Sequence, residues 1–176
     1  MNLRERDEFN WSAQFNPIFG SIVHAHIRHR FTQILPTQHQ DRFEKTDFHL
    51  IYPEQKFRVS ARCRRFHNLK WCDEVTIRSS AMNPKNSEWV RFLDGACDFF
   101  VYGFAAKGNS PPNLSYVTII DLEIFRVNRS LQGPQYGHPM EIRRVGQNNF
   151  MTLKLNAMQE AVLVSAEYPF RGKLFR

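Results

Sequence analysis

The sequence predicts an α/β fold in which helices flank a mixed central sheet. Two contrasting patterns support this prediction. Apolar residues recur at helical spacing over 17–35, whereas apolar and polar residues alternate with period two over 57–65. Of the 176 residues, 42% are hydrophobic and 14% are aromatic, which suffices for a buried core and argues against disorder. The length suits a single domain over 1–176.

The first expected helix, over 17–35, has a defined start and end. Asn16 can cap it, Pro17 takes the first helical position, and Pro36 ends it. No acidic residue accompanies the histidines on this helix, so a solvated or phosphate-facing side explains them better than a metal site. These histidines are His24, His26 and His29.

The middle of the chain predicts strands and a short helix. The strand segments are 47–52, 57–65, 73–78 and 99–104. The first two are expected to pair as a hairpin. A short helix over 88–93, capped by Ser87, precedes the last strand. The run FFVYGF at 99–104 is apolar throughout, as in a central strand covered on both faces, and its Gly103 indicates a close approach of backbone or helix.

The last third of the chain predicts further strands. The apolar segment 116–127 is expected to be a strand and its continuation, and 129–140 a surface loop. Two more elements are expected at 150–155 and 161–165, the second as a strand or a short helix. The core would then cover about 17–104, with 105–176 as a C-terminal elaboration.

Charge favours a polyanionic partner such as nucleic acid. Lys and Arg outnumber Asp and Glu by 24 to 17, for a net charge of +7. Basic residues concentrate over 56–65, which contains no acidic residue. The alternative is a basic protein without such a partner.

Cysteine usage and hydropathy predict the compartment. Cys63, Cys72 and Cys97 form no C-x-x-C pair, so they indicate neither a zinc site nor a disulfide framework. Three buried thiols in a reducing cytosol explain them simply. The charged start lacks a signal-peptide pattern, and no apolar run approaches the ~18 residues of a membrane span. We therefore expect a soluble, cytoplasmic protein with no membrane partner.

The strand expected over 57–65, FRVSARCRR, carries the candidate binding groups. One of its faces is apolar and the other presents guanidinium groups, which bind phosphate through bidentate hydrogen bonds. The alternative is a cross-strand charge lattice in which Asp73 and Glu74 neutralise some of the arginines. Nearby aromatic side chains, of Phe66, His67 and Trp71, could stack on bases or belong to the core. The candidate nucleic-acid contacts are Arg58, Arg62, Arg64, Arg65 and Arg78.

Asp47, at the head of the preceding strand, and the order of the elements together resemble the PD-(D/E)XK nuclease superfamily, over roughly 17–104. The stretches DFHLIY, FRVSARCRR, DEVTIRSS, SEWVRFLDG and DFFVYGF are also similar to small phage and bacterial proteins with this fold. The resemblance implies a restriction-endonuclease-like core with extra C-terminal strands. It also implies a divalent cation such as Mg²⁺, with Asp47 as a catalytic acid.

The chain departs from the family pattern at the second strand. Where the family places Glu-x-Lys, this sequence has Ser60-Ala61-Arg62. Serine cannot replace a carboxylate as an ionic ligand, and Arg62 keeps the charge of lysine but is too basic to exchange protons. Glu88 could supply the missing acid and bind Mg²⁺ with Asp47. Alternatively, it is simply favourable in a first helical turn. Asp121, a lone acid in an apolar segment, could be catalytic or a paired structural group.

Three functions remain open. The favoured one is a nucleic-acid-binding protein with a nuclease-like fold and impaired or absent phosphodiesterase activity. The second is an active Mg²⁺-dependent endonuclease that uses Asp47, Glu88 and Arg62. The third is a phage or mobile-element accessory protein that binds a host defence protein, since fold does not fix function. The first is favoured because the basic strand could hold phosphate but lacks the carboxylate that cleavage needs.

Overall fold

A mixed six-stranded sheet lies at the centre of the molecule. The computed structural model describes residues 7, 10–27, 35–37, 47–51, 55–80, 87–108, 113–137, 141–145 and 148–169. In spatial order the strands are β1 (Leu35–Thr37), β2 (Phe48–Ile51), β3 (Lys56–Arg64), β5 (Phe99–Ala105), β6 (Leu114–Asp121) and β9 (Val162–Glu167). Strands β3 and β5 are parallel and the other neighbours are antiparallel, so the predicted mixed sheet is confirmed.

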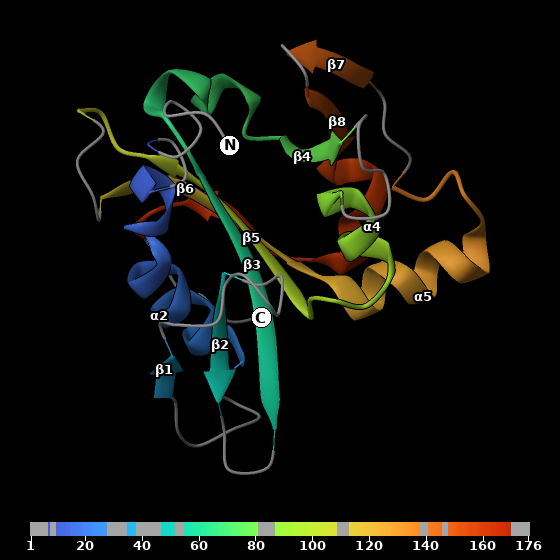
Figure 1. Cartoon of the computed structure of the whole chain (residues 1–176), viewed down its shortest axis with the longest axis horizontal. Coiled ribbons are helices and arrows are strands. Elements are labelled where there is room, and N and C mark those ends of the chain that lie inside the picture. Colours follow the sequence, from blue (N-terminus) through green and yellow to red (C-terminus); the bar gives the residue numbers. More distant parts are fainter. Residues whose placement is uncertain are drawn as a thin grey trace.

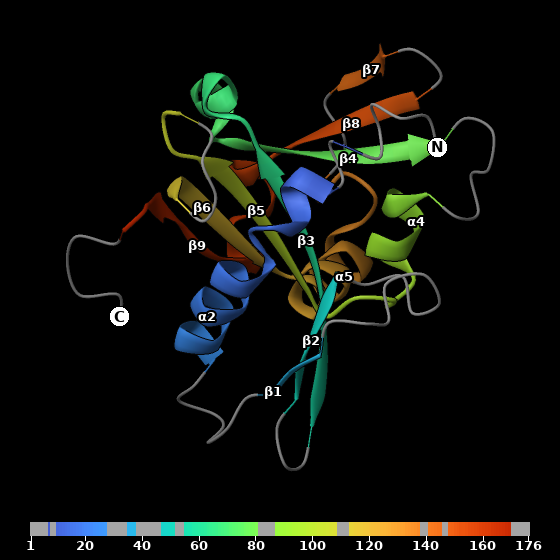
Figure 2. The same ribbon diagram turned by 60° about the vertical axis from the view of Figure 1, so that its left-hand side comes forward.

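Different layers cover the two faces of this sheet (Figure 1). Helix α2 (Asn16–Ile27) lies on one side, and helices α4 (Glu88–Leu93) and α5 (Leu122–Gln132) lie on the other, as the turned view also shows (Figure 2). Further elements include two 3-10 helices, η2 (Phe66–Trp71) and η4 (Leu155–Ala161), and a second sheet of β4 (Glu74–Ser80), β8 (Asn148–Lys154) and β7 (Glu141–Val145). In the part of the chain that the structure describes, no helix is long and apolar enough to cross a membrane.

Two hydrophobic clusters fill the space on either side of the central sheet. Side chains of α2, including Phe19 and Val23, pack with Val59 and Val101 in the first cluster. The second cluster joins Phe100, Tyr102 and Phe104 to residues of α4, α5 and the second sheet. Alternate residues of β5 therefore enter opposite clusters, and every residue of this strand is buried. The expected central strand covered on both faces is confirmed.

The expected hairpin is present, but β4 lies elsewhere than the predicted core implies. Strands β2 and β3 pair antiparallel, with Phe48 opposite Val59. Strand β4, predicted as the third strand, pairs with β8 in the second sheet and not with β3. The periodicity of a strand fixes which residues share a face but says nothing of its partner, and β7, the third strand of this sheet, was not predicted.

The first helix is shorter than its pattern predicts. Helix α2 ends at Ile27, and residues 35–37 form β1, which pairs with β2. Pro36 thus lies in a strand at the sheet edge, where the missing N–H is tolerated, and does not end a helix. Asn16, expected as the cap, lies within the helix, and its side chain donates to the Asp47 carbonyl oxygen at 3.5 Å. His29 lies outside the described residues.

The segment expected as a long strand divides at Asp121. Strand β6 ends there and α5 follows over 122–132, so the continuation as a strand and the loop start at 129 were wrong. One carboxylate oxygen of Asp121 accepts hydrogen bonds from the backbone N–H groups of Glu123 and Ile124, both at 3.0 Å. Asp121 therefore caps a helix, which is a common role for aspartate at this position. Over 161–165, the open alternative resolves to strand β9.

Gly103 allows α2 to approach the sheet. A Cβ atom at this position would lie 2.6 Å from Cε1 of Phe19 and 3.3 Å from Cδ2 of Leu114. Phe19 is fully buried, so its ring has little room to move. The close approach that the sequence predicts at this glycine is confirmed.

The variant Gly103→Ala should lower the free energy of unfolding by about 1–3 kcal/mol, because the added methyl group overpacks the ring of Phe19. Gly20→Ala is a matched control, since its Cβ would lie 3.7 Å from the nearest Phe48 atom and alanine favours a helix interior. Urea denaturation of both variants measures the effect. Equal stability of Gly103→Ala and the parent would contradict the packing described above.

Candidate nucleic-acid interface

The polar face of β3 lies against an apolar layer, so its groups need partners. Parallel pairing places Ser60 beside Phe100, Arg62 beside Tyr102 and Arg64 beside Phe104. Those three aromatic residues belong to the second hydrophobic cluster. Burying a charge is costly unless it is paired and hydrogen-bonded. The partners of each arginine therefore decide what this face can do.

Asp47 folds back onto β3. Its carboxylate oxygen Oδ2 accepts hydrogen bonds from Oγ of Ser60 at 3.0 Å and from the backbone N–H of Ala61. Its own backbone N–H donates to the Val59 carbonyl at 2.9 Å, which extends the pairing of β2 with β3 by one residue. Ser60, at the position where the family pattern has glutamate, thus contacts the predicted catalytic acid directly.

Arg62 and Glu88 form an ion pair between β3 and the first turn of α4. The two side chains are only 19% and 12% exposed. Glu88 is the first residue of α4, whose N-cap Ser87 accepts from the backbone N–H of Val90 at 3.2 Å. The expected capping residue is therefore confirmed, and Glu88 has a charged partner in addition to the favourable helix terminus.

The same ion pair hydrogen-bonds to the edge of β4. Arg62 donates through Nη1 to the Thr76 carbonyl at 2.8 Å, and Oε2 of Glu88 accepts from the backbone N–H of Arg78 at 2.7 Å. Residues two apart on a strand direct such groups to the same edge. Among the described strands β4 pairs with β8 alone, so the ion pair occupies positions where a second neighbouring strand would bind. It thereby connects the central sheet, α4 and the second sheet.

Arg58 is also held by a carboxylate. Its Nη2 lies 3.0 Å from Oδ1 of Asp98, and its backbone N–H donates to Oδ2 of the same residue at 2.7 Å. Hydrogen bonding to Asp98 raises the pKa of the Arg58 guanidinium above its ordinary value. This pair is more exposed than the previous one, at 40% and 27%, and it joins β3 to the residue before β5.

The other three arginines lie over aromatic rings. Arg64 lies between Tyr102 and Phe150, at 5.9 and 6.0 Å from the ring centroids, and its Nε donates to the Tyr102 hydroxyl at 2.8 Å. Arg78 lies 5.9 Å from the Phe150 centroid, and Arg65 lies 4.7 Å from that of Trp11. We call Arg64, Arg65 and Arg78 the ring-contacting arginines. The polar face of β3 thus carries the acid-paired Arg58 and Arg62 and the ring-contacting Arg64, with Arg78 beside it on β4, whereas Arg65 contacts Trp11 of the first cluster.

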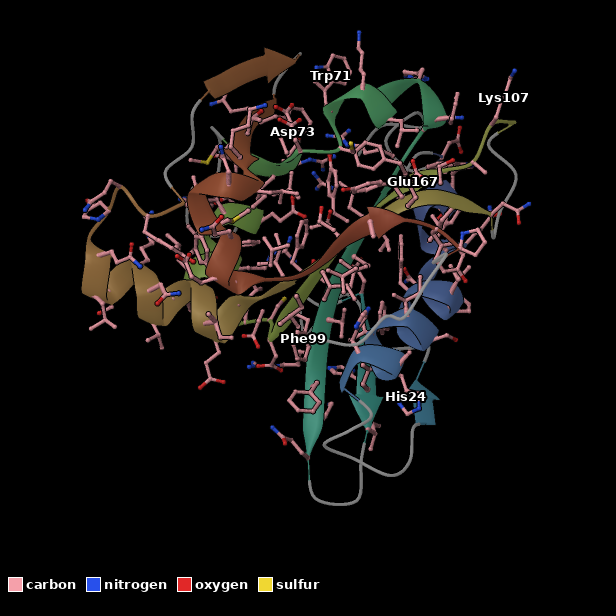
Figure 3. All side chains as sticks on the ribbon, turned by 180° about the vertical axis from the view of Figure 1, so that it is seen from behind. His24, Trp71, Asp73, Phe99, Lys107 and Glu167 are labelled. Carbon is pink, nitrogen blue, oxygen red and sulfur yellow. The ribbon has the colours of Figure 1, made fainter. Side chains whose placement is uncertain are left out.

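Asp73 and Glu74 pair with Lys154, and not with the arginines of β3 as in the charge-lattice alternative. Both lie 2.9 Å from Nζ of Lys154 on β8, and the hydrogen bond from Lys154 lowers the pKa of Asp73. Asp98 and Glu88, and not these two acids, pair with arginines of β3. Figure 3 shows Asp73 near Trp71 at one end of the molecule. Of the two alternatives left open for Phe66, His67 and Trp71, a place in the core does not apply, because none of these residues of η2 is buried.

The cysteines are all thiols, and two of the three are buried. Burial raises the pKa of Cys97 to about 12 and also raises that of Cys63. Cys72 is partly exposed, unlike the expected buried thiol. Among the described residues, no group of three or more His, Cys, Asp or Glu side chains is arranged to hold a metal ion. The pair of Asp47 and Glu88 as ligands of Mg²⁺ stays a prediction.

Sequence reasoning missed several residues that complete the site. Asp98, the partner of Arg58, directly precedes the apolar strand. An acidic residue at the start of a strand is the sequence feature that could have identified it. Tyr102 and Phe150 were expected only as strand residues, and no local pattern brings them to Arg64. Thr76 contributes a backbone carbonyl, which no sequence pattern identifies.

Comparison with known proteins found no match among protein-family models, curated proteins or solved structures. The resemblance to PD-(D/E)XK nucleases therefore stays a prediction based on the residues quoted above.

Removing one charge of the Arg62–Glu88 pair should destabilise the protein. We expect Glu88→Gln to lower the free energy of unfolding by about 1–3 kcal/mol, because Arg62 keeps a largely buried charge without its counter-charge. The double variant with Arg62→Gln should recover part of this loss, which a double-mutant cycle in urea measures. Asp73→Asn is the exposed control and should have little effect. Additive single losses would contradict direct coupling between Arg62 and Glu88.

Proposed function

We propose that this protein binds nucleic acid through the arginine-rich side of β3 and has little or no phosphodiesterase activity. The position of Arg64 and Arg78 beside one partly exposed ring, that of Phe150, is the observation that carries this proposal. Arg58 and Arg62 are paired with carboxylates. The three ring-contacting arginines, Arg64, Arg65 and Arg78, lie against aromatic side chains.

Arg64 and Arg78 lie beside the same ring, that of Phe150, at 6.0 and 5.9 Å from its centroid. A guanidinium group beside a ring keeps its positive charge and can bind phosphate through its N–H groups. These two arginines are the phosphate contacts in this proposal, and Arg58 and Arg62 position the strands. Arg78, which is exposed, extends the surface onto the second sheet.

The carboxylates favour binding over cleavage. Oδ2 of Asp47 already accepts two hydrogen bonds, and Oε2 of Glu88 accepts from both Arg62 and the backbone of Arg78. A divalent cation on Glu88 would have to displace Arg62 or lie beside its positive charge, which Coulomb repulsion disfavours. Arg62 also cannot exchange a proton with water as a lysine could. This donor set fits an arginine–carboxylate pair better than Mg²⁺.

Binding should depend on salt and on the ring-contacting arginines. The double variant Arg64→Gln/Arg78→Gln should weaken nucleic-acid binding and reduce the slope of log affinity against log salt by about 2, because two phosphate contacts are lost. Fluorescence anisotropy with a labelled oligonucleotide at several salt concentrations measures both quantities.

The control for that experiment removes the same charge from other positions. Lys56→Gln/Lys107→Gln changes two exposed lysines, one at the start of β3 and one beyond the end of β5. It should change the salt slope by much less. Equal effects of the two double variants would show that only net charge matters, and the assignment of the surface would be wrong. A tight protein complex without measurable nucleic-acid affinity would favour the accessory-protein alternative.

Cleavage is tested separately. Incubating the protein with plasmid, single-stranded DNA and RNA, in the presence of Mg²⁺ or Mn²⁺, should leave all three substrates intact, because both candidate acids are engaged within the protein. Electrophoresis of the products gives the readout. Metal-dependent cleavage that is lost in both Asp47→Ala and Glu88→Gln would instead establish the endonuclease alternative.

A further inference from the structure

The second sheet has two chemically different faces. Val75, Ile77 and Leu153 are fully buried in the second hydrophobic cluster. The intervening residues of the same strands form the other face, where Thr76 pairs with Thr152 and Arg78 pairs with Phe150. Phe150 is thus a large aromatic residue on the mainly polar face, and it is partly exposed.

Basic residues from both sheets meet at Phe150. Arg78 comes from β4 within the same sheet, at 5.9 Å from the ring centroid, and Arg64 comes from the end of β3 in the central sheet, at 6.0 Å. On the opposite side of β8, Arg143 of β7 occupies the register position paired with Phe150. Apolar packing alone does not require two arginines beside this ring.

We infer that Phe150 is a stacking platform for a base of single-stranded nucleic acid, with Arg64 and Arg78 holding the adjacent phosphates. Every base has a π-face that an aromatic ring or a guanidinium plane can stack on, so such a platform binds with little sequence preference. A base in a duplex is already stacked and paired, whereas an unpaired base can be splayed onto a sheet surface. The inference rests on the proposed function and adds the strand state of the ligand.

The geometry also suits a chain that crosses between the sheets. Arg64 is fixed by its hydrogen bond to Tyr102, and the backbone of Arg78 is fixed by Glu88. Arg64 therefore starts from a defined position beside the ring of Phe150, so it loses fewer degrees of freedom when a phosphate binds. The Arg62–Glu88 pair, which connects β3 to β4, maintains the distance between them.

The test compares Phe150→Leu with the parent on a labelled single-stranded oligonucleotide and on a duplex of the same sequence. Leucine keeps an apolar side chain but has no π-face. Single-strand affinity should fall roughly 5- to 100-fold, and duplex affinity should change by less than about twofold. Phe150→Tyr should restore single-strand binding, because it keeps the aromatic ring. Thermal unfolding of each variant confirms that the comparison is made between folded proteins.

The matched control is Phe57→Leu. Phe57 is a partly exposed phenylalanine on the apolar face of β3, where it packs on Phe99 at 5.4 Å between centroids, and its loss should leave binding unchanged. Parent-like single-strand affinity of Phe150→Leu, or equal losses for single strand and duplex, would overturn the stacking inference and leave nucleic-acid binding in place. A parent protein that binds neither oligonucleotide would overturn the proposed function as well.

Discussion

The ion pair between Arg62 and Glu88 is the interaction on which the arrangement of the two sheets depends. It joins β3 to α4 through the side chains, and it joins both to β4 through the Thr76 carbonyl and the Arg78 N–H. A strand edge that carries such groups must bond them to something, because leaving them buried and unbonded is costly. Here two side chains do so, in place of a strand. Together with the second hydrophobic cluster, these bonds hold the second sheet against the central one.

The need to compensate buried charge also gives the arginines of β3 different roles. A strand with a basic face against an apolar layer cannot leave every charge without compensation. Arg58 and Arg62 receive carboxylates at the strand's start and middle, and Arg64 reaches the aromatic residues Tyr102 and Phe150 near its end. Consecutive positions on one face therefore have different chemistry. Asp47 and Arg62 thus serve the fold through their hydrogen bonds and ion pair, while Arg64 and Arg78 carry the proposed binding.

Particular elements show how much of the fold and of the site could be predicted from the sequence. Strand β5 was predictable because a short, continuous apolar run is typical of a strand buried on both faces. Helix α4 was predictable because Ser87 is a typical N-cap residue. The division at Asp121 was missed because LEIF fits a strand as well as a helix, and the aspartate was read as a lone acid and not as a cap. At the site, the basic residues were predictable, whereas their partners Asp98, Tyr102 and Phe150 are 38 to 86 residues away along the chain.

The sequence by itself determined the α/β class, the central position of β5, the two-faced character of β3 and the excess of positive charge. These properties are local, since they depend on periodicity, caps and composition. Only the tertiary structure decided that Arg58 and Arg62 receive carboxylates and that Arg64 lies over the rings of Tyr102 and Phe150. It also decided that β4 leaves the central sheet to pair with β8. The physical reason is that an ion pair or a ring contact is defined by distance in space, and no pattern within a strand encodes which distant residue will be its neighbour.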